Sequence, residues 1–412
     1  MSDFRFVVMG DSRSNDLSSY INTAVLGSAN QSISALSPSA DFVIFLGDDS
    51  VLGDADFNGT NAFTYQDWYN FMRTPPTGLP AQTPLYLVIG NHELYQASLG
   101  DTVSSYTSQT GYQTFMAQNT MFSPTTFMPK TTSHSGYENL DYSFTSSDGQ
   151  SLFVVLDAFY VPSSPSAPYS DPGSLDYNQL TYLNNTLSSS TATTKFVITH
   201  NPTFSPNYEN YDTAVSPTMG QYWQILDNNN VSAAFSGHDH LYSRVMVDSS
   251  FTNGSSDPNP GLNFKNTIPQ IIAGSVGAPL TGTVSNEAST IYAPASWNVK
   301  DLYNYSVVDV HNSDDDSKVS TVTVNTYTSD GTSPWTLSDS FTEINSPTNG
   351  RVFTIPSSSS ATSLPLLQNN GASQSSLDNS SLSPLSVASG LFETLSPASS
   401  AQGLQLSQYS GV

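Results

Sequence analysis

The chain has 412 residues, with 34 acidic and 10 basic side chains, a formal net charge of −24 and no cysteine. This charge repels nucleic-acid backbones and anionic membranes, which argues against a basic surface that binds either. The lack of cysteine excludes a disulfide framework and a thiolate metal site. No apolar stretch approaches the roughly 18–20 residues of a membrane-spanning helix. The Ser-, Thr- and Asn-rich composition is typical of secreted proteins, so we expect an extracellular or cell-surface location.

Short apolar runs alternate with helical patterns in the first part of the chain. Strands separated by helical segments indicate βαβ units and a sheet that is covered on both faces. Apolar spacing and helix-stop signals define the boundaries. In chain order, the predicted elements are a strand at 5–9, a helix at 17–36, a strand at 42–46, a helix at 65–72 and a strand at 84–89.

Two later segments have the pattern of antiparallel hairpins. Residues 142–157 surround the turn signal Ser147-Asp-Gly149, and residues 307–328 surround Asp314-Asp-Asp316. Antiparallel pairs added to a βαβ framework suggest a second sheet packed on the first. We therefore predict one folded domain over residues 1–345.

The composition changes at about Ser346. Residues 346–412 are rich in Ser, Gln, Asn and Pro, and Arg351, Asp378 and Glu393 are their only charged side chains. This segment has scattered Leu residues but no sustained period. It is interpreted as a flexible tail, with an interaction segment that docks on a partner or supports self-assembly as the alternative.

Five short segments place metal-ligand or phosphate-binding residue types just after predicted strands, the last two after apolar runs at 195–199 and 231–235. Ligand sites of parallel sheets lie beyond the carboxyl ends of the strands, so all five segments can converge on one edge. Their carboxylate, amide and imidazole groups suit two hard or borderline divalent cations. The segments are Gly10-Asp-Ser-Arg13, Gly47-Asp-Asp49, Gly90-Asn-His-Glu93, His200-Asn-Pro202 and Gly237-His-Asp-His240.

The order of these motifs resembles that of the calcineurin-like metallophosphoesterase superfamily. His200-Asn-Pro202 and Gly237-His-Asp-His240 are most similar to the purple acid phosphatase branch. The resemblance covers roughly residues 4–345 and implies an α/β fold, a four-layer αββα sandwich with mixed sheets. It also implies hydrolysis of small phosphate esters by a metal-bound hydroxide. Loops between the motifs decide between monoesters and diesters, so both remain open.

The same resemblance implies a dinuclear metal centre in which Asp48 bridges both ions. One ion would be completed by an amide and two imidazoles, and the other by one further carboxylate and one further imidazole. The ions would be divalent or of the Fe, Mn or Zn type. Two cations about 3.5–4 Å apart activate a shared water and clamp the phosphoryl oxygens. The implied ligands are Asn91, His200 and His238 for the first ion and Asp11 and His240 for the second.

His92 would not bind metal but would protonate or stabilise the leaving group, a task that an unperturbed pKa near ~6.5 suits. Many family members have a histidine where Arg13 stands, and purple acid phosphatases have a tyrosine where Val51 stands. Arg13 cannot ligate a metal. It is expected either to contact substrate phosphate or to pair with Asp11 or Asp48. We therefore expect a weak metal in the Asp11 site, or a single-metal enzyme.

Three residues or segments near these motifs invite simpler interpretations. Glu93 is expected to orient its neighbours by hydrogen bonds, and Asp49 to be solvated or to act from behind the ligands. Asp54-Ala-Asp-Phe-Asn-Gly59 begins like an EF-hand loop but has Tyr65 rather than Glu at its twelfth position.

Two further functions compete with phosphate-ester hydrolysis. The chain would be a secreted structural or surface-assembly protein if the scaffold has lost catalysis, and a calcium-stabilised adhesion module if metal serves stability alone. His134 and His311 lie outside the motifs and are interpreted as surface residues, with a substrate lid as the alternative for His134.

Overall fold

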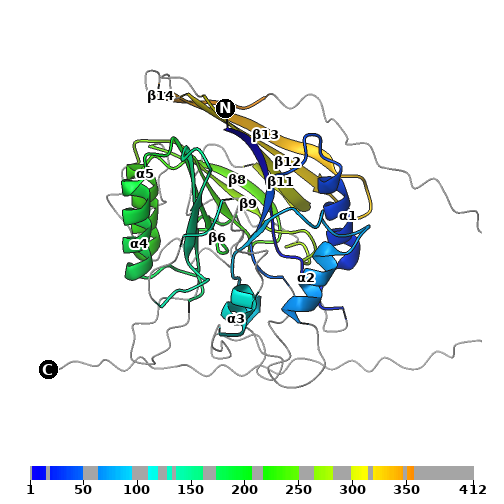
Figure 1. The fold of residues 1–412 in the computed structure, drawn as a ribbon. Helices are drawn as coiled ribbons and strands as arrows, with labels where there is room; N and C mark the ends of the chain where they lie inside the picture. The colour runs from blue at the N-terminus through cyan, green and yellow to red at the C-terminus, as the bar shows by residue number, and fades with distance from the viewer. Residues whose placement is uncertain are drawn as a thin grey trace, which may run out of the picture. The chain divides into compact units, whose positions relative to one another are not determined.

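Two mixed β-sheets form the centre of the molecule (Figure 1). The computed structural model describes residues 2–14, 19–49, 64–94, 110–118, 128–131, 136–160, 173–206, 217–249, 264–281, 298–313, 319–346 and 350–356. Within this part, the first sheet has the order β14 (Gly350–Thr354), β13 (Thr336–Ser346), β12 (Ser320–Ser329), β11 (Tyr303–Asn312), β1 (Ser2–Met9), β2 (Phe42–Phe45) and β3 (Leu85–Leu87). The second has the order β10 (Asn298–Lys300), β8 (Tyr242–Val247), β9 (Ile268–Ala273), β7 (Ala233–Ser236), β6 (Thr194–Thr199), β5 (Ser151–Leu156) and β4 (Tyr142–Thr145).

Each sheet combines a parallel part with antiparallel additions. Strands β1, β2 and β3 are parallel, whereas β11 to β14 join β1 as an antiparallel series. In the second sheet β5, β6, β7 and β9 are parallel, and β4, β8 and β10 pair antiparallel. This arrangement confirms the predicted mixed sheets, including both predicted hairpins.

Helices cover the outer faces of the sheets, which gives the predicted four-layer α/β sandwich (Figure 1). Helices α1 (Thr23–Ser34) and α2 (Tyr65–Arg73) lie on the side of the first sheet, and α4 (Tyr177–Ser189) and α5 (Pro217–Asn228) on the side of the second. A further helix, α3 (Thr110–Gln118), contacts α2.

Strand β1 shows how one sequence serves two cores. Because successive side chains of a strand point to opposite faces, Phe4, Phe6 and Val8 pack between the sheets while Val7 and Met9 face the helices. The Phe6 ring stacks on Phe42 at 5.2 Å and meets Phe153 edge-on at 5.3 Å. Replacing such a buried ring by alanine costs about 3–5 kcal/mol, so the aromatic layer holds the two sheets together.

Hydrogen-bonding side chains set the helix starts. Thr64 and Asp67 form a reciprocal capping box at α2, which begins at Tyr65 as predicted. Helix α1 begins later than the sequence pattern suggested. The Asn22 side chain accepts from the Val25 amide and caps the helix there. Ile21, just before it, forms a bridge with Arg13, so residue 21 does not belong to the helix.

The first sheet continues beyond residue 345. Strand β14 pairs with β13, and Arg351 on β14 forms a buried ion pair with Glu343, with 2.7 Å between Nε and Oε1. The Arg351 guanidinium also donates to the carbonyl oxygens of Val231 and Thr267, at 2.8 and 3.0 Å. Residues 350–354 of the segment assigned to the tail therefore belong to the sheet, and residues 357–412 lie outside the described part.

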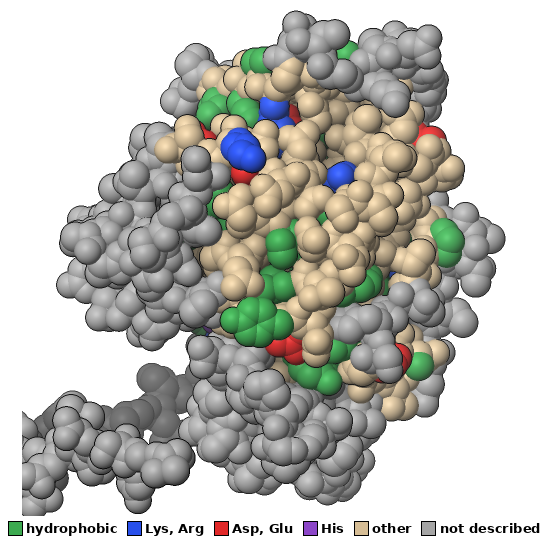
Figure 2. Space-filling view, turned by 90° about the vertical axis from the view of Figure 1, so that its left-hand side faces the viewer, with side chains coloured by type: hydrophobic (Ala, Val, Ile, Leu, Met, Phe, Trp, Pro, Cys, Tyr) green, Lys and Arg blue, Asp and Glu red, His purple; other side chains and the backbone are tan. Residues whose placement is uncertain are grey.

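The face in Figure 2 carries few charged side chains in its described part, and uncharged polar groups and backbone cover most of it. This sparse charge follows from a composition in which charged residues make up 11% of the chain. Among the described residues, no helix combines the length and the apolar character that a membrane span requires.

Candidate metal centre

The five motif segments meet where the carboxyl ends of β1, β2, β3, β6 and β7 come together. Asp11, after β1, donates its backbone N–H to the Gly47 carbonyl at 2.9 Å. Gly237, after β7, donates to the His200 carbonyl at 2.8 Å. The Asp11 carboxylate accepts from the backbone N–H of His238 at 3.1 Å, which links the two sheets. The site is therefore built from both sheets at once.

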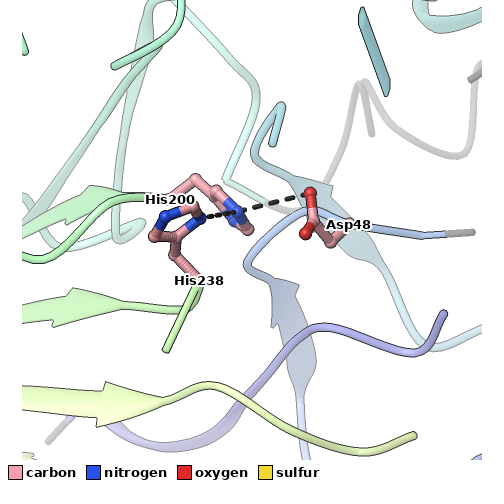
Figure 3. A group of neighbouring side chains, drawn as sticks. All are labelled: Asp48, His200 and His238. Atoms are coloured by element: carbon pink, nitrogen blue, oxygen red, sulfur yellow. Dashed lines mark hydrogen bonds and ion pairs between the residues drawn. The ribbon is translucent and has the colours of Figure 1, made fainter. Parts of the chain in front are cut away.

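Four donor atoms converge on one point, which we call the first donor group: Asp48 Oδ1, Asn91 Oδ1, His200 Nε2 and His238 Nδ1. The His200 nitrogen lies 3.3 Å from the Asp48 oxygen, 3.2 Å from the Asn91 oxygen and 3.3 Å from the His238 nitrogen. The His238 nitrogen lies 3.0 Å from the Asn91 oxygen. Figure 3 shows Asp48, His200 and His238 approaching one another from separate loops. All but His238 are at least nine-tenths buried.

The spacing and chemistry of the first donor group fit a metal ion. Donors bound at about 2.0–2.2 Å to one ion lie about 3.0–3.5 Å from each other, and the observed separations fall in that range. His200 Nδ1 lies 2.6 Å from the Leu46 carbonyl oxygen, which can only accept. Nδ1 therefore carries the proton, and in a neutral ring Nε2 points its lone pair at other acceptors. A cation bound among these atoms would satisfy the lone pair and the neighbouring oxygens.

The pKa shifts around Asp48 also indicate that this group of side chains favours a positive charge. Burial would raise the pKa of the Asp48 carboxyl, but His200 and His92 hold it well below its usual range. Burial would lower the pKa of His200, but Asp48 and Asp11 raise it to about 10. Burial and the charge of His200 lower the pKa of His238 well below its usual value. Without a metal, a proton on His200 thus supplies the missing positive charge.

A second donor group consists of Asp11, Asp48 and His240, whose donor atoms lie within 4.8 Å of one another. His240 Nε2 is 3.7 Å from Asp11 Oδ1. Arg13 enters this group: its Nε is 3.8 Å from Asp48 Oδ2 and its Nη2 is 3.5 Å from His240 Nε2. Burial and the nearby Arg13 lower the pKa of His240 to about 3. Burial raises the pKa of Asp11 well above its usual range, against the lowering effect of His200.

The backbone at three donors is strained. Asp11, Asp48 and His238 have φ angles of 58°, 54° and 68°, a region that costs non-glycine residues about 1–3 kcal/mol. The neighbouring glycines leave room for the donors. A Cβ at Gly90 would lie 2.3 Å from Asp48 Oδ1, and one at Gly237 would lie 2.5 Å from Asp11 Oδ2. Glycine at these two positions thus lets the backbone come close to the carboxylates of Asp48 and Asp11.

Glu93 connects the loops behind the donors. Its carboxylate accepts from the backbone N–H groups of Asp48, Asp49 and Gly90, at 3.0, 2.8 and 2.6 Å. This is the orienting role predicted for Glu93. Burial, followed by the charge of Asp48, raises the Glu93 pKa to about 7. Asp49 is only 1% exposed, so the solvated interpretation of this residue was wrong.

His92 lies beside the donors without joining either group. It begins a short 3₁₀ helix, η2 (His92–Leu94), and its backbone N–H donates to Asp48 Oδ1 at 3.0 Å. Its Nε2 is 3.9 Å from Asp48 Oδ2. The backbone bond and this distance place His92 next to the carboxylate that both groups share.

Sequence reasoning missed two contributors to the site. The Phe159 ring lies 5.7 Å from the His200 ring and 5.6 Å from the His238 ring, and forms an apolar wall. The loop after β9 places the Pro279 carbonyl 2.8 Å from His240 Nδ1. In the same loop Ala278 donates to the Asp11 carbonyl at 2.8 Å. The available signal was a further segment, residues 274–279, which begins with glycine directly after an apolar run as four of the five motifs do.

The remaining candidates lie away from the donors or outside the described residues. His311 is a partly exposed residue that pairs with Asp3, as expected of a surface histidine. Val51, His134 and the residues from Asp54 to Gly59 fall outside the described part of the chain.

The fold of this chain is similar to that of solved structures. PhoD matches with a TM-score of 0.53 and 13% identity, covering 87% of this chain and 72% of that chain, and shows the shared fold. The purple acid phosphatase PPD1 of yellow lupin (Lupinus luteus) matches with a TM-score of 0.49 and 15% identity, covering 83% of this chain and 53% of that one. This chain therefore corresponds to about half of the lupin protein.

GAP50, the anchor in the inner membrane complex of Plasmodium, matches with a TM-score of 0.47 and 13% identity, covering 80% of this chain and 85% of that one. No curated protein matches in a search by sequence. A family model described as calcineurin-like phosphoesterase matches residues 4–242. Because this match spans more than half of the chain, the protein belongs to the calcineurin-like phosphoesterase family.

Proposed function

We propose that the protein hydrolyses small phosphate esters at the edge where the two sheets meet, with a metal ion in the first donor group. The observation that carries this proposal is the convergence of Asp48, Asn91, His200 and His238 at separations of 3.0–3.3 Å. A bound ion would supply Lewis acidity and activate water for attack on phosphorus. Iron, manganese and zinc all suit this mixed oxygen and nitrogen donor set.

The residues of the chain would divide the remaining work. Asp48 contributes to both donor groups and is held by its neighbours in the ionised form. His92 would hold a proton at Nε2 and give it to the leaving oxygen, because its ring is fixed beside Asp48. Arg13 would contact a phosphoryl oxygen through its guanidinium, whose planar fork matches phosphate geometry.

Substrate access depends on this local positive charge. The chain as a whole carries a net charge of −24, which repels anionic esters. A metal ion, Arg13 and His92 would offset that repulsion at the site alone. We therefore expect small phosphate esters rather than nucleic-acid polymers as substrates.

The decisive experiment measures metal content and hydrolysis on the same purified sample. The protein is freed of metal with a chelator, reconstituted separately with Mn²⁺, Zn²⁺ or Fe²⁺, and assayed with an aryl phosphate monoester and a diester. We expect hydrolysis that depends on the added metal and disappears on chelation. A preparation that binds metal but hydrolyses neither ester would contradict the proposal.

A second candidate is a surface-assembly protein on the same scaffold without catalysis. The contact of Arg13 with His240, at 3.5 Å, favours it, because this guanidinium lies among donors that a dinuclear enzyme would use for metal. This candidate predicts no bound metal and a protein that polymerises or docks through residues 357–412. Size-exclusion chromatography with and without those residues distinguishes it from the hydrolase.

We also propose that the protein acts outside the cell or at its surface. The Ser-, Thr- and Asn-rich, Lys-poor composition supports this location. Fractionation of producing cells, with the protein detected by antibody in medium, surface and interior fractions, tests it. Recovery from the interior alone would contradict this location.

A further inference from the structure

Arg13 has a fixed position inside the second donor group. Its backbone forms an antiparallel bridge with Ile21, and the next residue, Ser14, donates to the Tyr20 carbonyl at 3.0 Å. The Arg13 side chain is 20% exposed, whereas Asp48 beside it is 1% exposed. The bridge with Ile21 thus holds the Arg13 backbone in a position from which the guanidinium reaches a buried carboxylate.

The Arg13 guanidinium faces the electron pair that a metal would need. His240 Nδ1 lies 2.8 Å from the Pro279 carbonyl oxygen and therefore carries the proton of the neutral ring. Nε2 is then the free acceptor, and Arg13 Nη2 lies 3.5 Å from it. Arg13 Nε lies 3.8 Å from Asp48 Oδ2. The other oxygen of this carboxylate, Oδ1, belongs to the first donor group.

A metal ion and this guanidinium cannot both occupy the second donor group without strong repulsion. An ion bound to Asp11, Asp48 and His240 would lie about 2.0–2.2 Å from each donor atom. It would therefore lie close to the Arg13 nitrogens, which are 3.8 Å from Asp48 Oδ2 and 3.5 Å from His240 Nε2. Arginine stays charged at all working pH values, so the repulsion cannot be relieved by losing a proton. The donors Asp11 and Asp48 are buried, which leaves little water to screen it.

We propose that Arg13 is a built-in cation that replaces the second metal, so that each chain holds one metal ion, in the first donor group. This inference rests on the proposed metal-dependent function of the same site. It assigns Asp48 Oδ2 and His240 a new role, because they hold the guanidinium rather than a second metal ion, and Asp11 is then no metal ligand. The guanidinium then presents its remaining N–H groups to the substrate phosphate.

Metal stoichiometry of the full chain tests the inference directly. The metal-free protein and three variants, Arg13→Ala, Arg13→His and Arg13→Lys, are dialysed against excess Mn²⁺, and bound manganese is measured by elemental analysis. Arg13→Lys keeps the positive charge and is the matched control. We expect about one ion per chain for the parent and for Arg13→Lys, and about two for Arg13→Ala and Arg13→His.

Electron paramagnetic resonance of the same samples provides a second readout that does not depend on activity. One Mn²⁺ per chain gives the six-line signal of an isolated ion. Two ions about 3.5–4 Å apart couple magnetically and give a different spectrum. Thermal unfolding of each metal-free variant verifies that it is folded before its stoichiometry is interpreted.

The outcomes separate this inference from the proposed function. Two ions in the parent, with metal-dependent hydrolysis, overturn the inference and leave the hydrolase intact. One ion in the parent and in the folded Ala and His variants also overturns it, because removing the guanidinium then admits no second ion. No ion in the folded parent removes the metal-dependent function itself, and the inference falls with it.

Discussion

The two donor groups share Asp48 and yet balance their negative charge in different ways. In the first group, the positive charge is exchangeable, because either a proton on His200 or a metal ion can supply it. In the second, Arg13 supplies a charge that cannot leave. The comparison teaches that similar sets of carboxylates and imidazoles do not imply equal metal sites. The Arg13 guanidinium closes the second donor group to a metal ion, whereas the first group can bind one.

The largest effect is expected from Asp48→Ala, because Asp48 is the residue that both donor groups use. Metal binding should be lost, and ester hydrolysis should fall by at least about 10³-fold, since the metal contributes several kcal/mol to charge stabilisation. Elemental analysis and an aryl phosphate assay measure both. Asp330→Ala, in the exposed turn before β13, is the control and should change neither. Retained metal in the Asp48 variant would show that the first group is misassigned.

His92→Ala should separate proton transfer from metal binding. His92 belongs to neither donor group, so metal content should stay at the parent level while kcat falls by about 10²–10⁴-fold. Substrates with a better leaving group should lose less, because they need less protonation. A uniform loss across leaving groups would speak against the proposed acid role.

Asn91→Ala removes one donor from the first group, and His240→Ala removes one from the second, so that their effects on metal affinity can be compared. Removing Asn91 should weaken binding of the metal by at least about 10–100-fold, the loss typical of residues that merely support a ligand. Removing His240 should leave the affinity of the first ion nearly unchanged, because its partner is Arg13. Isothermal titration of the metal-free variants measures both affinities. Equal losses would erase the distinction between the groups.

The smallest effect is the release of a proton when metal binds to the first group. His200 has its folded pKa raised to about 10, so at pH 8 the metal-free protein holds a proton that the metal must displace. The stabilisation from that proton is complete below an unfolded pKa of about 6.5 and is lost as pH rises through the folded value. Titrations at pH 8 in two buffers of different protonation enthalpy should give about one proton per ion. A binding enthalpy that is independent of the buffer would contradict it.

The convergence of the first donor group could be predicted from the sequence, because the direction of a strand determines at which edge of the sheet its following motif lies. A motif after a parallel strand lies at the carboxyl edge, so Asp48, Asn91 and His200 were expected to meet. The apolar run that predicted the strand at 5–9 contains Phe6, and alternation along the strand places this residue between the sheets, but the aromatic layer that it joins was not predicted.

Other parts of the site had no chemical signature in the sequence. The carbonyl oxygens of Leu46 and Pro279 orient two imidazoles, but any residue type supplies a backbone carbonyl. Phe159 resembles any core aromatic until its ring is placed against the histidines. The direction of the Arg13 side chain depends on its bridge with Ile21, a tertiary contact that local propensity does not encode.

The ion pair between Glu343 and Arg351 determines where the chain can be truncated without losing stability. A recombinant chain ending at residue 345 would keep Glu343 inside the protein and lose its partner, a change that costs about 3–5 kcal/mol for buried pairs. It would also leave the Val231 and Thr267 carbonyls without the donors from Arg351. Ending at residue 356 avoids both losses. Thermal melts of the two truncated proteins should therefore show the shorter one unfolding at the lower temperature.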